Sequence, residues 1–341
     1  MTSLDKGSSS RQNAIWKTER KIAFIYYGVS SFVGQDYEIL SKHFDVEEVN
    51  YRTPKDIYKM ARTIFNSDLT YAWFASGHSF IAVLLSKMLN KLSIVVAGGY
   101  DVAFVPEMDY GQYAFRKDKR MYTDYVLKNA DVILAVSEFT KREVLARTEP
   151  KMVKVVYNGI NTNKFVPGSE KENLVMTVAS GSKNVIKLKG IDAFAKAAAH
   201  IPGTRFLVMG LSDKAKEILE AKCPSSNLEL CGYASQKELI KYYQKAKVYC
   251  QLSYRESFGV ALAEAMACEC VPVVTDRGAL PEVVGDTGIY VPYGDEKAIV
   301  NGIKNALKSD KGALARKRIE EKFSLHERER ALIETMESLY D

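Results

Sequence analysis

The sequence predicts an α/β protein built from two doubly wound, Rossmann-like domains. Short, nearly continuous apolar segments, as expected of strands buried in a parallel sheet, alternate with longer segments of helical periodicity. The alternation stops once, at residues 157–168, where Asn158-Gly159 and Pro167-Gly168 supply turn chemistry without a period, and then it resumes. A chain of 341 residues also suits two domains of ordinary size.

The first domain is expected over residues 21–168 and the second over 169–324. Residues 1–20 are polar and lack the apolar core of a signal peptide, so a flexible tail is expected there. Ligands of such sheets bind at the carboxyl ends of the strands. Strands are predicted at residues 21–27, 46–50, 71–75, 92–97, 132–136 and 153–156, and then at 174–179, 205–210, 227–231, 248–252, 271–275 and 288–291. Helices are predicted at residues 37–43, 54–65, 80–90, 138–147, 189–200, 214–221, 235–245, 258–268 and 296–307, followed by two helices within 311–340 that break near Ser324.

The composition indicates a globular protein without a membrane-spanning segment. The chain is 47% hydrophobic and 26% charged, as globular domains are, and no apolar run approaches the roughly 20 residues of a membrane span. A net charge of +6 permits anionic ligands or membrane surfaces but does not require nucleic acid, which we do not expect as a partner. The five cysteines include no Cys-x-x-Cys pair, so neither a disulfide framework nor a zinc site is expected, and a cytoplasmic location fits best.

Signatures of other nucleotide-binding enzymes are absent from the sequence. There is no Gly-x-Gly-x-x-Gly, which weakens a nicotinamide-dependent reading, and no Gly-x4-Gly-Lys-Ser/Thr, which weakens a P-loop reading. An Asp-x-Asp metal-binding pair is also missing. We therefore expect neither a tightly bound cofactor nor a metal ion.

Residues 253–264 carry the strongest functional signal. Glu256 and Glu264 have seven residues between them, with an apolar strand before the first and a helix-favouring segment around the second. Ser257 suits the helix N-cap, which would place Glu256 in a loop and Glu264 within the helix. The free N–H groups at a helix start bind anions, and here they would belong to Phe258, Gly259 and Val260.

This stretch resembles the donor-site motif of the retaining glycosyltransferases of family 4, which are GT-B enzymes that use nucleotide sugars. The resemblance covers most of the chain from about residue 21 and includes the crossover N-G-I-N-T-N-K-F-V-P. It implies two Rossmann-like domains that face a central cleft, with the donor on the second domain and the acceptor on the first. The helix at about 325–341 would return to the first domain. Glu264 would bind the ribose, and Glu256 would bind hydroxyls of the donor sugar and help orient its anomeric carbon.

Residues 178–190 are similar to the family's donor-phosphate segment. By position, Lys183 and Lys189 would hold the diphosphate of a UDP- or GDP-sugar and stabilise the charge that develops as it leaves. The family usually has arginine at the first position, and lysine keeps the charge without the bidentate fork. The resemblance requires no metal if these cations neutralise the phosphates.

The first domain departs from the family pattern in two places. Of the family's Gly-Gly pair after the first strand only Gly34 is present, and its backbone would approach the donor phosphates. The family's histidine is replaced by Gly98 in Gly-Gly-Tyr-Asp. Asp101 and Tyr100 of this second loop, and His78 at the end of another strand, are predicted to face the acceptor.

The sequence thus predicts a retaining glycosyltransferase that acts on a hydroxyl of a glycan or lipid-linked acceptor. A GT-B epimerase or phosphorylase would share the fold, and the missing histidine also suits a non-catalytic sugar-nucleotide-binding protein. Residues 110–128 mix tyrosines with cations such as Lys117, Lys119 and Arg120. They predict either a peripheral contact with the inner face of a membrane or a solvated helix whose tyrosines pack on its own domain.

Overall fold

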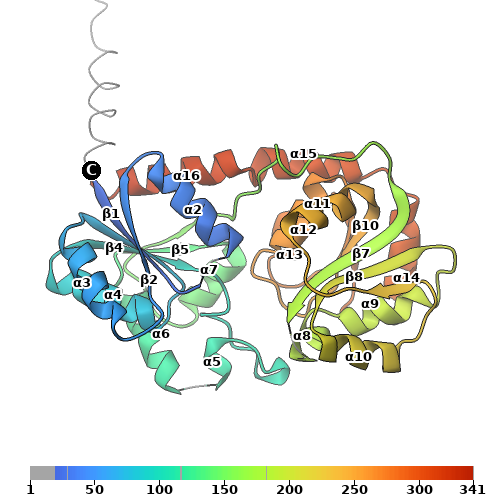
Figure 1. The fold of residues 1–341 in the computed structure, drawn as a ribbon, viewed down its shortest axis with the longest axis horizontal. Coiled ribbons are helices and arrows are strands. Elements are labelled where there is room, and N and C mark those ends of the chain that lie inside the picture. Colours follow the sequence, from blue (N-terminus) through green and yellow to red (C-terminus); the bar gives the residue numbers. More distant parts are fainter. Residues whose placement is uncertain (1–19, 29, 116, 182, 341) are drawn as a thin grey trace, which may run out of the picture. The chain divides into compact units, whose positions relative to one another are not determined.

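The computed structural model describes residues 20–28, 30–115, 117–181 and 183–340, apart from the side chains at 115–118 and 180–184 (Figure 1). The chain divides into two compact units, of which the first ends at Val156 and the second begins at Tyr157. The predicted tail at residues 1–20 lies outside this description except for Arg20. Among the described residues, no helix is long and apolar enough to cross a membrane.

The first unit is built on a six-stranded parallel sheet of order β2-β1-β3-β4-β5-β6. The order reverses between β1 and β3, so the loops after these strands lie at the sheet's switch point. Its strands are β1 (Lys21–Tyr26), β2 (Asp45–Asn50), β3 (Leu69–Trp73), β4 (Leu92–Ala97), β5 (Val132–Ala135) and β6 (Val153–Val155). Its helices are α2 (Ser31–Ser41), α3 (Asp56–Phe65), α4 (Gly77–Met88), η1 (Pro106–Met108), α5 (Gln112–Phe115), α6 (Lys117–Asn129) and α7 (Glu138–Leu145).

The second unit repeats this plan with a six-stranded parallel sheet of order β12-β11-β10-β7-β8-β9. Its first strand, β7, lies in the middle beside β10, and this is the switch point of the second sheet. The strands are β7 (Glu172–Gly181), β8 (Arg205–Leu211), β9 (Leu228–Leu230), β10 (Ala246–Gln251), β11 (Val271–Thr275) and β12 (Ile289–Val291). The helices are α8 (Lys183–Leu188), α9 (Ile191–Ala198), α10 (Asp213–Lys222), α11 (Gln236–Lys245), α12 (Val260–Ala267), α13 (Leu280–Val284), α14 (Glu296–Leu307), α15 (Gly312–Lys322) and α16 (Leu325–Glu337).

The two parallel sheets confirm the predicted doubly wound fold class, and each predicted strand overlaps an observed one. The break near Ser324 is also confirmed, because the Ser324 hydroxyl accepts from the Glu327 N–H and caps α16. The domain limits at 168/169 and the packing of the last helix on the first domain remain predictions.

Three predictions about local structure were wrong. Gly34 lies in the first turn of α2, where its N–H donates to the Ser30 carbonyl, rather than in a loop. The helix predicted at 189–200 starts only at Ile191 as α9, because Gly190 before it has a left-handed φ of 65°, and the preceding helix α8 was not predicted. Ser257 does not cap α12: the helix begins at Val260 after Gly259, which has a φ of 92°.

Candidate functional site

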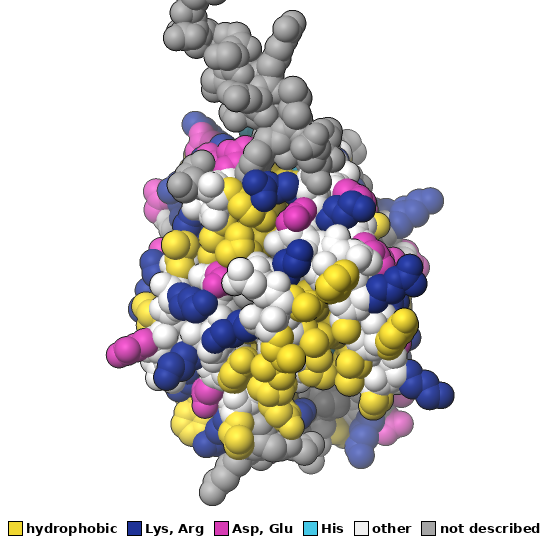
Figure 2. Space-filling view, turned by 90° about the vertical axis from the view of Figure 1, so that its left-hand side faces the viewer, with side chains coloured by type: hydrophobic (Ala, Val, Ile, Leu, Met, Phe, Trp, Pro, Cys, Tyr) yellow, Lys and Arg dark blue, Asp and Glu magenta, His cyan; other side chains and the backbone are white. Residues whose placement is uncertain are grey.

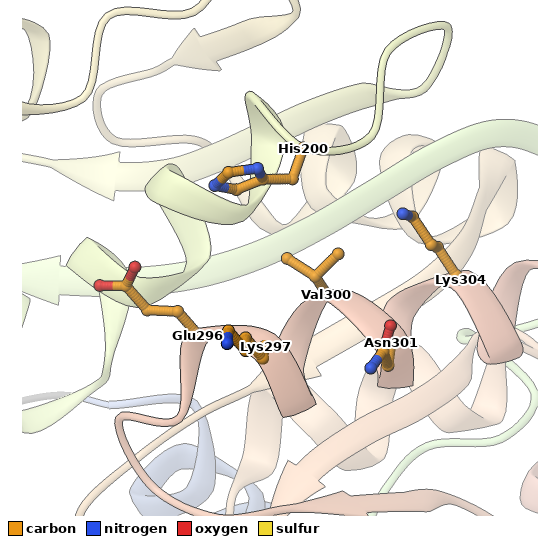
Figure 3. Close-up of a pocket in the computed structure, with 6 residues that line it drawn as sticks. All are labelled: His200, Glu296, Lys297, Val300, Asn301 and Lys304. Atoms are coloured by element: carbon orange, nitrogen blue, oxygen red, sulfur yellow. The ribbon is translucent and has the colours of Figure 1, made fainter.

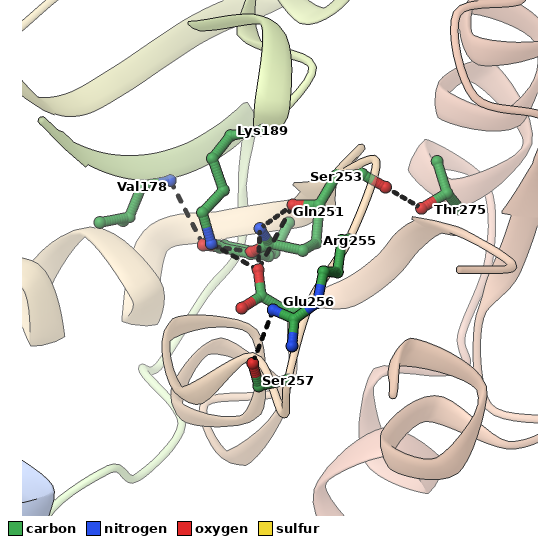
Figure 4. Close-up of polar contacts among 9 residues, drawn as sticks. Val178, Lys189, Gln251, Ser253, Arg255, Glu256, Ser257 and Thr275 are labelled. Atoms are coloured by element: carbon green, nitrogen blue, oxygen red, sulfur yellow. Dashed lines mark hydrogen bonds and ion pairs between the residues drawn. The ribbon is translucent and has the colours of Figure 1, made fainter. Parts of the chain in front are cut away.

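A cluster of polar side chains surrounds Glu256 at the carboxyl ends of β7 and β10 (Figure 4). Lys189 Nζ lies 2.5 Å from Glu256 Oε2, and Gln251 Nε2 and Ser253 Oγ lie 3.2 and 3.4 Å from the same oxygen. Within the described part of the chain, no hydrogen bond reaches the other oxygen, Oε1. One oxygen is therefore held by a cation and two polar groups, while the second can accept from a ligand hydroxyl.

Buried side chains in β10 and just after its end support this cluster. Tyr249, Gln251 and Ser253 alternate along the chain and so point to one side of the sheet. The Val178 N–H donates to the Tyr249 hydroxyl over 3.3 Å, this hydroxyl lies 3.3 Å from Gln251 Oε1, and Gln251 Nε2 lies 2.7 Å from Ser253 Oγ. These residues were not predicted from the sequence, although their period of two was visible in it.

The backbone of the Glu256 loop is pinned to its neighbours. The Tyr254 N–H donates to the Leu188 carbonyl over 2.8 Å, and the Ala279 N–H donates to the Glu256 carbonyl over 2.9 Å. A Cβ on Gly278, which has a φ of 63°, would lie 2.3 Å from the Glu256 carbonyl oxygen. A glycine at 278 is therefore needed for the loop to hold Glu256 as it does.

The amino end of α12 opens beside this loop. The described residues supply no side-chain cap, so the first helical amides, those of Val260, Ala261 and Leu262, remain available to an anion. Of the three predicted amides, only that of Val260 belongs to the helix. The Ser257 hydroxyl instead accepts from Arg255 Nη1 over 3.0 Å, and the Phe258 ring is buried.

Glu264 lies one turn further along α12 and is 8% exposed. The Tyr243 hydroxyl lies 3.4 Å from Glu264 Oε2, and the side chain of Gln236 also bonds to the carboxyl group. Burial raises the pKa of Glu264 to about 7, against the two hydrogen bonds and the charge of Lys164, which lower it. The ring centroids of Tyr243 and Tyr249 lie 5.9 Å apart. This buried pair lies between Glu264, which Tyr243 contacts, and the Gln251 side chain that contacts Glu256.

The predicted acceptor residues of the first unit differ in accessibility. Asp101 is 1% exposed, its two oxygens accept from the Ala75 and Gly99 N–H groups over 2.7 Å each, and burial raises its pKa. In this arrangement the carboxyl group joins the loops after β3 and β4. Tyr100 is 45% exposed and available to a ligand.

His78 is buried, and both ring nitrogens are engaged. Nδ1 lies 2.8 Å from Ser76 Oγ, and Nε2 lies 2.7 Å from the Trp73 carbonyl oxygen. Burial lowers the pKa of His78 to about 4, so the ring is neutral at pH 7. Its described contacts fix the start of α4.

Phe74 explains why residue 98 is a glycine. A Cβ added to Gly98 would lie 2.2 Å from a carbon of the Phe74 ring. Phe74 has a left-handed φ of 68° and packs with Phe32 and Trp73 at ring distances of 6.1 and 5.5 Å. No side chain can occupy position 98 unless this aromatic ring moves.

Three other predictions concern Gly34, Lys183 and metal binding. Gly34 lies on α2, and a Cβ there would meet nothing within 4 Å. Lys183 is the first residue of α8, but its side chain lies outside the description, as does Arg116 in the predicted membrane segment. In the part of the chain that the structure describes, no group of three His, Cys, Asp or Glu side chains could hold a metal ion.

A separate hollow of about 530 Å³ lies over α9 and α14 (Figure 3). Glu296 pairs with Lys196 over 2.5 Å at this surface. None of the predicted site residues contributes to the hollow, which is lined by His200, Glu296, Lys297, Val300, Asn301 and Lys304.

Comparison with protein families gives two matches that together span most of the chain. The family described as "Glycosyl transferases group 1" matches residues 160–323, and "Glycosyltransferase Family 4" matches residues 38–164. The two matches meet close to the division between the units.

Curated relatives are glycosyltransferases of several kinds. The D-inositol 3-phosphate glycosyltransferase of Mycolicibacterium smegmatis is 26% identical over 56% of this chain and 48% of its own length. The capsular polysaccharide biosynthesis glycosyltransferase CapM of Staphylococcus aureus is 29% identical over 79% of this chain and 82% of its own. The chain spans about half the length of several of the curated relatives that it matches.

Solved structures resemble the whole described fold. Anabaena Alr3699/HepE in complex with UDP and glucose has a TM-score of 0.75 over 94% of this chain and 100% of its own, at 16% identity. Sucrose-phosphate synthase from Thermosynechococcus elongatus has a TM-score of 0.74 over 94% of this chain and 99% of its own, also at 16% identity. At this identity the likeness bears on the fold alone.

Proposed function

This chain belongs to glycosyltransferase family 4 and has the GT-B fold, and on this basis we propose that it transfers a sugar from a nucleoside-diphosphate sugar to a hydroxyl of a glycan or lipid-linked acceptor. The observation that carries the proposal is the meeting of Lys189 and Glu256 beside the open amides of α12. Cations and amides suit a diphosphate, and a fixed carboxylate suits sugar hydroxyls.

The donor is a UDP- or GDP-sugar bound to the second unit. Two solved relatives support UDP: HepE, whose complex holds UDP and glucose, and Staphylococcus aureus TarM, whose complex holds UDP with α-GlcNAc-glycerol. Glu264 binds the ribose hydroxyls. Gly34 does not offer its N–H to the donor phosphates, because this group is bonded to the Ser30 carbonyl within α2.

The reaction breaks the bond between the anomeric carbon and the diphosphate oxygen. Negative charge develops on the leaving diphosphate, and Lys189, Lys183 and the first amides of α12 stabilise it, so that no metal is required. Glu256 binds hydroxyls of the donor sugar through Oε1 while Lys189, Gln251 and Ser253 hold Oε2. The acceptor hydroxyl oxygen bonds to the anomeric carbon on the face from which the diphosphate leaves, its proton passes to the departing phosphate oxygen, and the anomeric configuration is retained.

The acceptor binds the first unit, where Tyr100 offers an exposed ring and hydroxyl. Asp101 and His78 shape the same loops through the hydrogen bonds that now occupy their polar atoms, and a direct contact with the acceptor requires those bonds to open. The enzyme acts in the cytoplasm, with a peripheral hold on the inner face of a membrane if its acceptor is lipid-linked.

A non-catalytic sugar-nucleotide-binding protein is the second candidate. Gly98 favours it, because the Phe74 ring lies where a side chain at position 98 would begin. Such a protein would bind a nucleotide sugar without turning it over, even slowly to water.

One experiment separates these functions. Thermal-shift screening with UDP, GDP and their common sugars identifies the donor, since a ligand that binds only the folded state raises its stability. Release of nucleoside diphosphate is then measured with and without glycan and lipid-linked acceptors. Release that depends on acceptor supports transfer, and equal release without acceptor argues against it. A thermal shift without any release identifies a binding protein.

A further inference from the structure

The helical layer of the first unit has an apolar outer face. Helices α3, α4 and α6 pack side by side on the sheet, with the Phe80 ring of α4 5.0 Å from Tyr122 and 4.9 Å from Tyr125 of α6. Their inner faces supply the core through Met60, Ile64, Ala82, Val83, Val126 and Leu127. A surface helix normally turns charged residues to the solvent on its other side.

These helices instead expose large apolar side chains. Tyr58 and Phe65 of α3 are 79% and 65% exposed, and Met88 of α4 and Met121 of α6 are 74% and 71% exposed. Leu84 lies one turn before Met88 and is also exposed. Single exposed apolar side chains are ordinary, but several on three adjacent helices mark an interaction surface.

Helix α4 makes the departure clearest. Its sequence, G-H-S-F-I-A-V-L-L-S-K-M, contains one lysine and no acidic residue, and its histidine faces inward. Val83 packs in the core, while Leu84 and Met88 face outward. A helix that is apolar all round is expected to be buried on all sides, yet within the described chain this face of α4 is uncovered.

Basic side chains outnumber acidic ones among the described residues of these three helices. Figure 2, which views the left-hand side of Figure 1 where α3, α4 and α6 lie, shows a continuous apolar area bordered by lysine and arginine side chains and by some acidic ones. The acidic residues of these helices whose side chains are described are engaged elsewhere: Asp56 accepts from the Arg52 and Thr53 N–H groups, and Asp124 accepts from the Tyr113 hydroxyl. The described basic residues of the three helices are Lys59, Arg62, Lys87, Lys119, Arg120 and Lys128.

We propose that this α3/α4/α6 face, centred on Tyr58, Phe65, Leu84, Met88 and Met121, docks on the surface of an anionic lipid bilayer. Apolar side chains that enter the boundary between head groups and acyl chains, and cations that remain among anionic head groups, are the two features that bind a protein to such a surface. A second copy of the chain fits less well, because a symmetric contact would bring two basic borders together.

The α3/α4/α6 face extends the membrane contact predicted from residues 110–128. That segment supplies α6, but most of the apolar centre lies on α3 and α4, which are far from it in the sequence. The docking does not rest on the proposed transfer reaction, because lipid binding can be measured without a donor or an acceptor.

The test is co-sedimentation of the full chain with phosphatidylcholine vesicles that contain or lack phosphatidylglycerol. We expect sedimentation only with the anionic vesicles, and release by salt, which screens charges over about 10 Å at 0.1 M. The double substitution Phe65→Ser/Met88→Ser should lower the partition coefficient by at least about tenfold. Leu314→Ser removes a comparably exposed apolar side chain from α15 of the second unit and should leave it unchanged.

The outcomes separate the possible occupants of the face. Equal sedimentation of the double variant and the parent would overturn the proposal. Loss of binding only in the triple variant Lys117→Gln/Lys119→Gln/Arg120→Gln would also overturn it and would place the lipid contact at the amino end of α6 alone. A parent chain that ignores vesicles but is a dimer by analytical ultracentrifugation, with the double variant monomeric, would assign the face to a second copy and equally overturn the proposal. Unchanged thermal unfolding of the double variant shows that it is folded.

Discussion

In the proposed donor complex, Lys189 and Glu256 would each gain a ligand as a second partner. In the free protein they neutralise one another over 2.5 Å, which avoids leaving either charge unpaired in a half-buried site. In the proposed complex the ammonium group also faces the diphosphate and the carboxylate faces the sugar. The pair therefore keeps both side chains in the orientation that the reaction needs before the donor arrives.

Replacing Lys189 by alanine should slow the reaction strongly. Loss of one fixed group that stabilises the leaving diphosphate costs about 2–4 kcal/mol, which is a fall in kcat/KM of roughly 30- to 1,000-fold. Lys187→Ala is the matched control, because this lysine is two residues earlier on α8 and is exposed. Nearly full activity of Lys189→Ala in steady-state assays would show that the diphosphate lies elsewhere.

Glu264 should make nucleotide binding depend on pH. Its pKa is about 7 in the free protein, and ribose hydroxyls donate to the ionised form, so affinity should rise from pH 6 to pH 8 with release of a proton. Because burial raises the folded-state pKa above the usual 4.5, this group's stabilisation is present below pH 4.5 and is lost by pH 7. The loss amounts to about 3 kcal/mol at 1.4 kcal/mol per pKa unit.

Calorimetric titration of nucleoside diphosphate across this pH range tests the claim. Glu264→Gln should bind with a flat pH profile, and its free energy of unfolding should fall less than that of the parent between pH 4.5 and 7. Identical profiles in the two proteins would remove the ribose role from Glu264.

The loops and helix ends of the second unit owe their shape to glycines with left-handed φ. Gly190 separates α8 from α9 where a Cβ would lie 2.2 Å from the Leu252 carbonyl oxygen, and Gly259 starts α12. Gly278 touches the backbone of Glu256. These positions let the loops after β7, β10 and β11, which are neighbouring strands of one sheet, pack closely against one another.

Gly278→Ala should therefore displace the Glu256 loop. Its Cβ would lie 2.3 Å from the Glu256 carbonyl oxygen, and the combined clash and backbone strain should lower the free energy of unfolding by roughly 2–4 kcal/mol, with loss of turnover. Gly294→Ala is the control, because Gly294 has a φ of 77° but a Cβ there would meet nothing within 4 Å. Equal unfolding midpoints of the two variants in thermal denaturation would argue against the pinned loop.

The strands could be predicted from the sequence because buried parallel strands are short apolar runs bounded by turns. The start of α12 and the break between α8 and α9 could not, since a glycine with positive φ looks the same in sequence as any other glycine. The support of Glu256 by Tyr249, Gln251 and Ser253 was visible only as alternation. Asp101 was predicted to face a ligand, but its hydrogen bonds to the Ala75 and Gly99 N–H groups depend on backbone positions that no motif encodes.

The molecule as a whole divides its tasks between two units that share one architecture. Each unit has its own parallel sheet and its own switch point, and each matches a different glycosyltransferase family description. The second unit carries the Glu256 cluster proposed for the donor, and the first carries both the loops proposed for the acceptor and the apolar α3/α4/α6 face. In this arrangement the first unit would bind both the lipid surface and the acceptor, and the second unit would bind the nucleotide.

The second unit is proposed to bind a nucleotide sugar with one glutamate for binding and another for reaction. Nucleotide affinity and turnover, measured in parallel for Glu264→Ala and Glu256→Ala, test this division of roles. We expect Glu264→Ala to raise the Kd of the nucleoside diphosphate by about tenfold or more. Glu256→Ala should keep that Kd within about threefold while turnover falls by about a hundredfold. Unchanged affinity and turnover in both variants would contradict the proposed donor site.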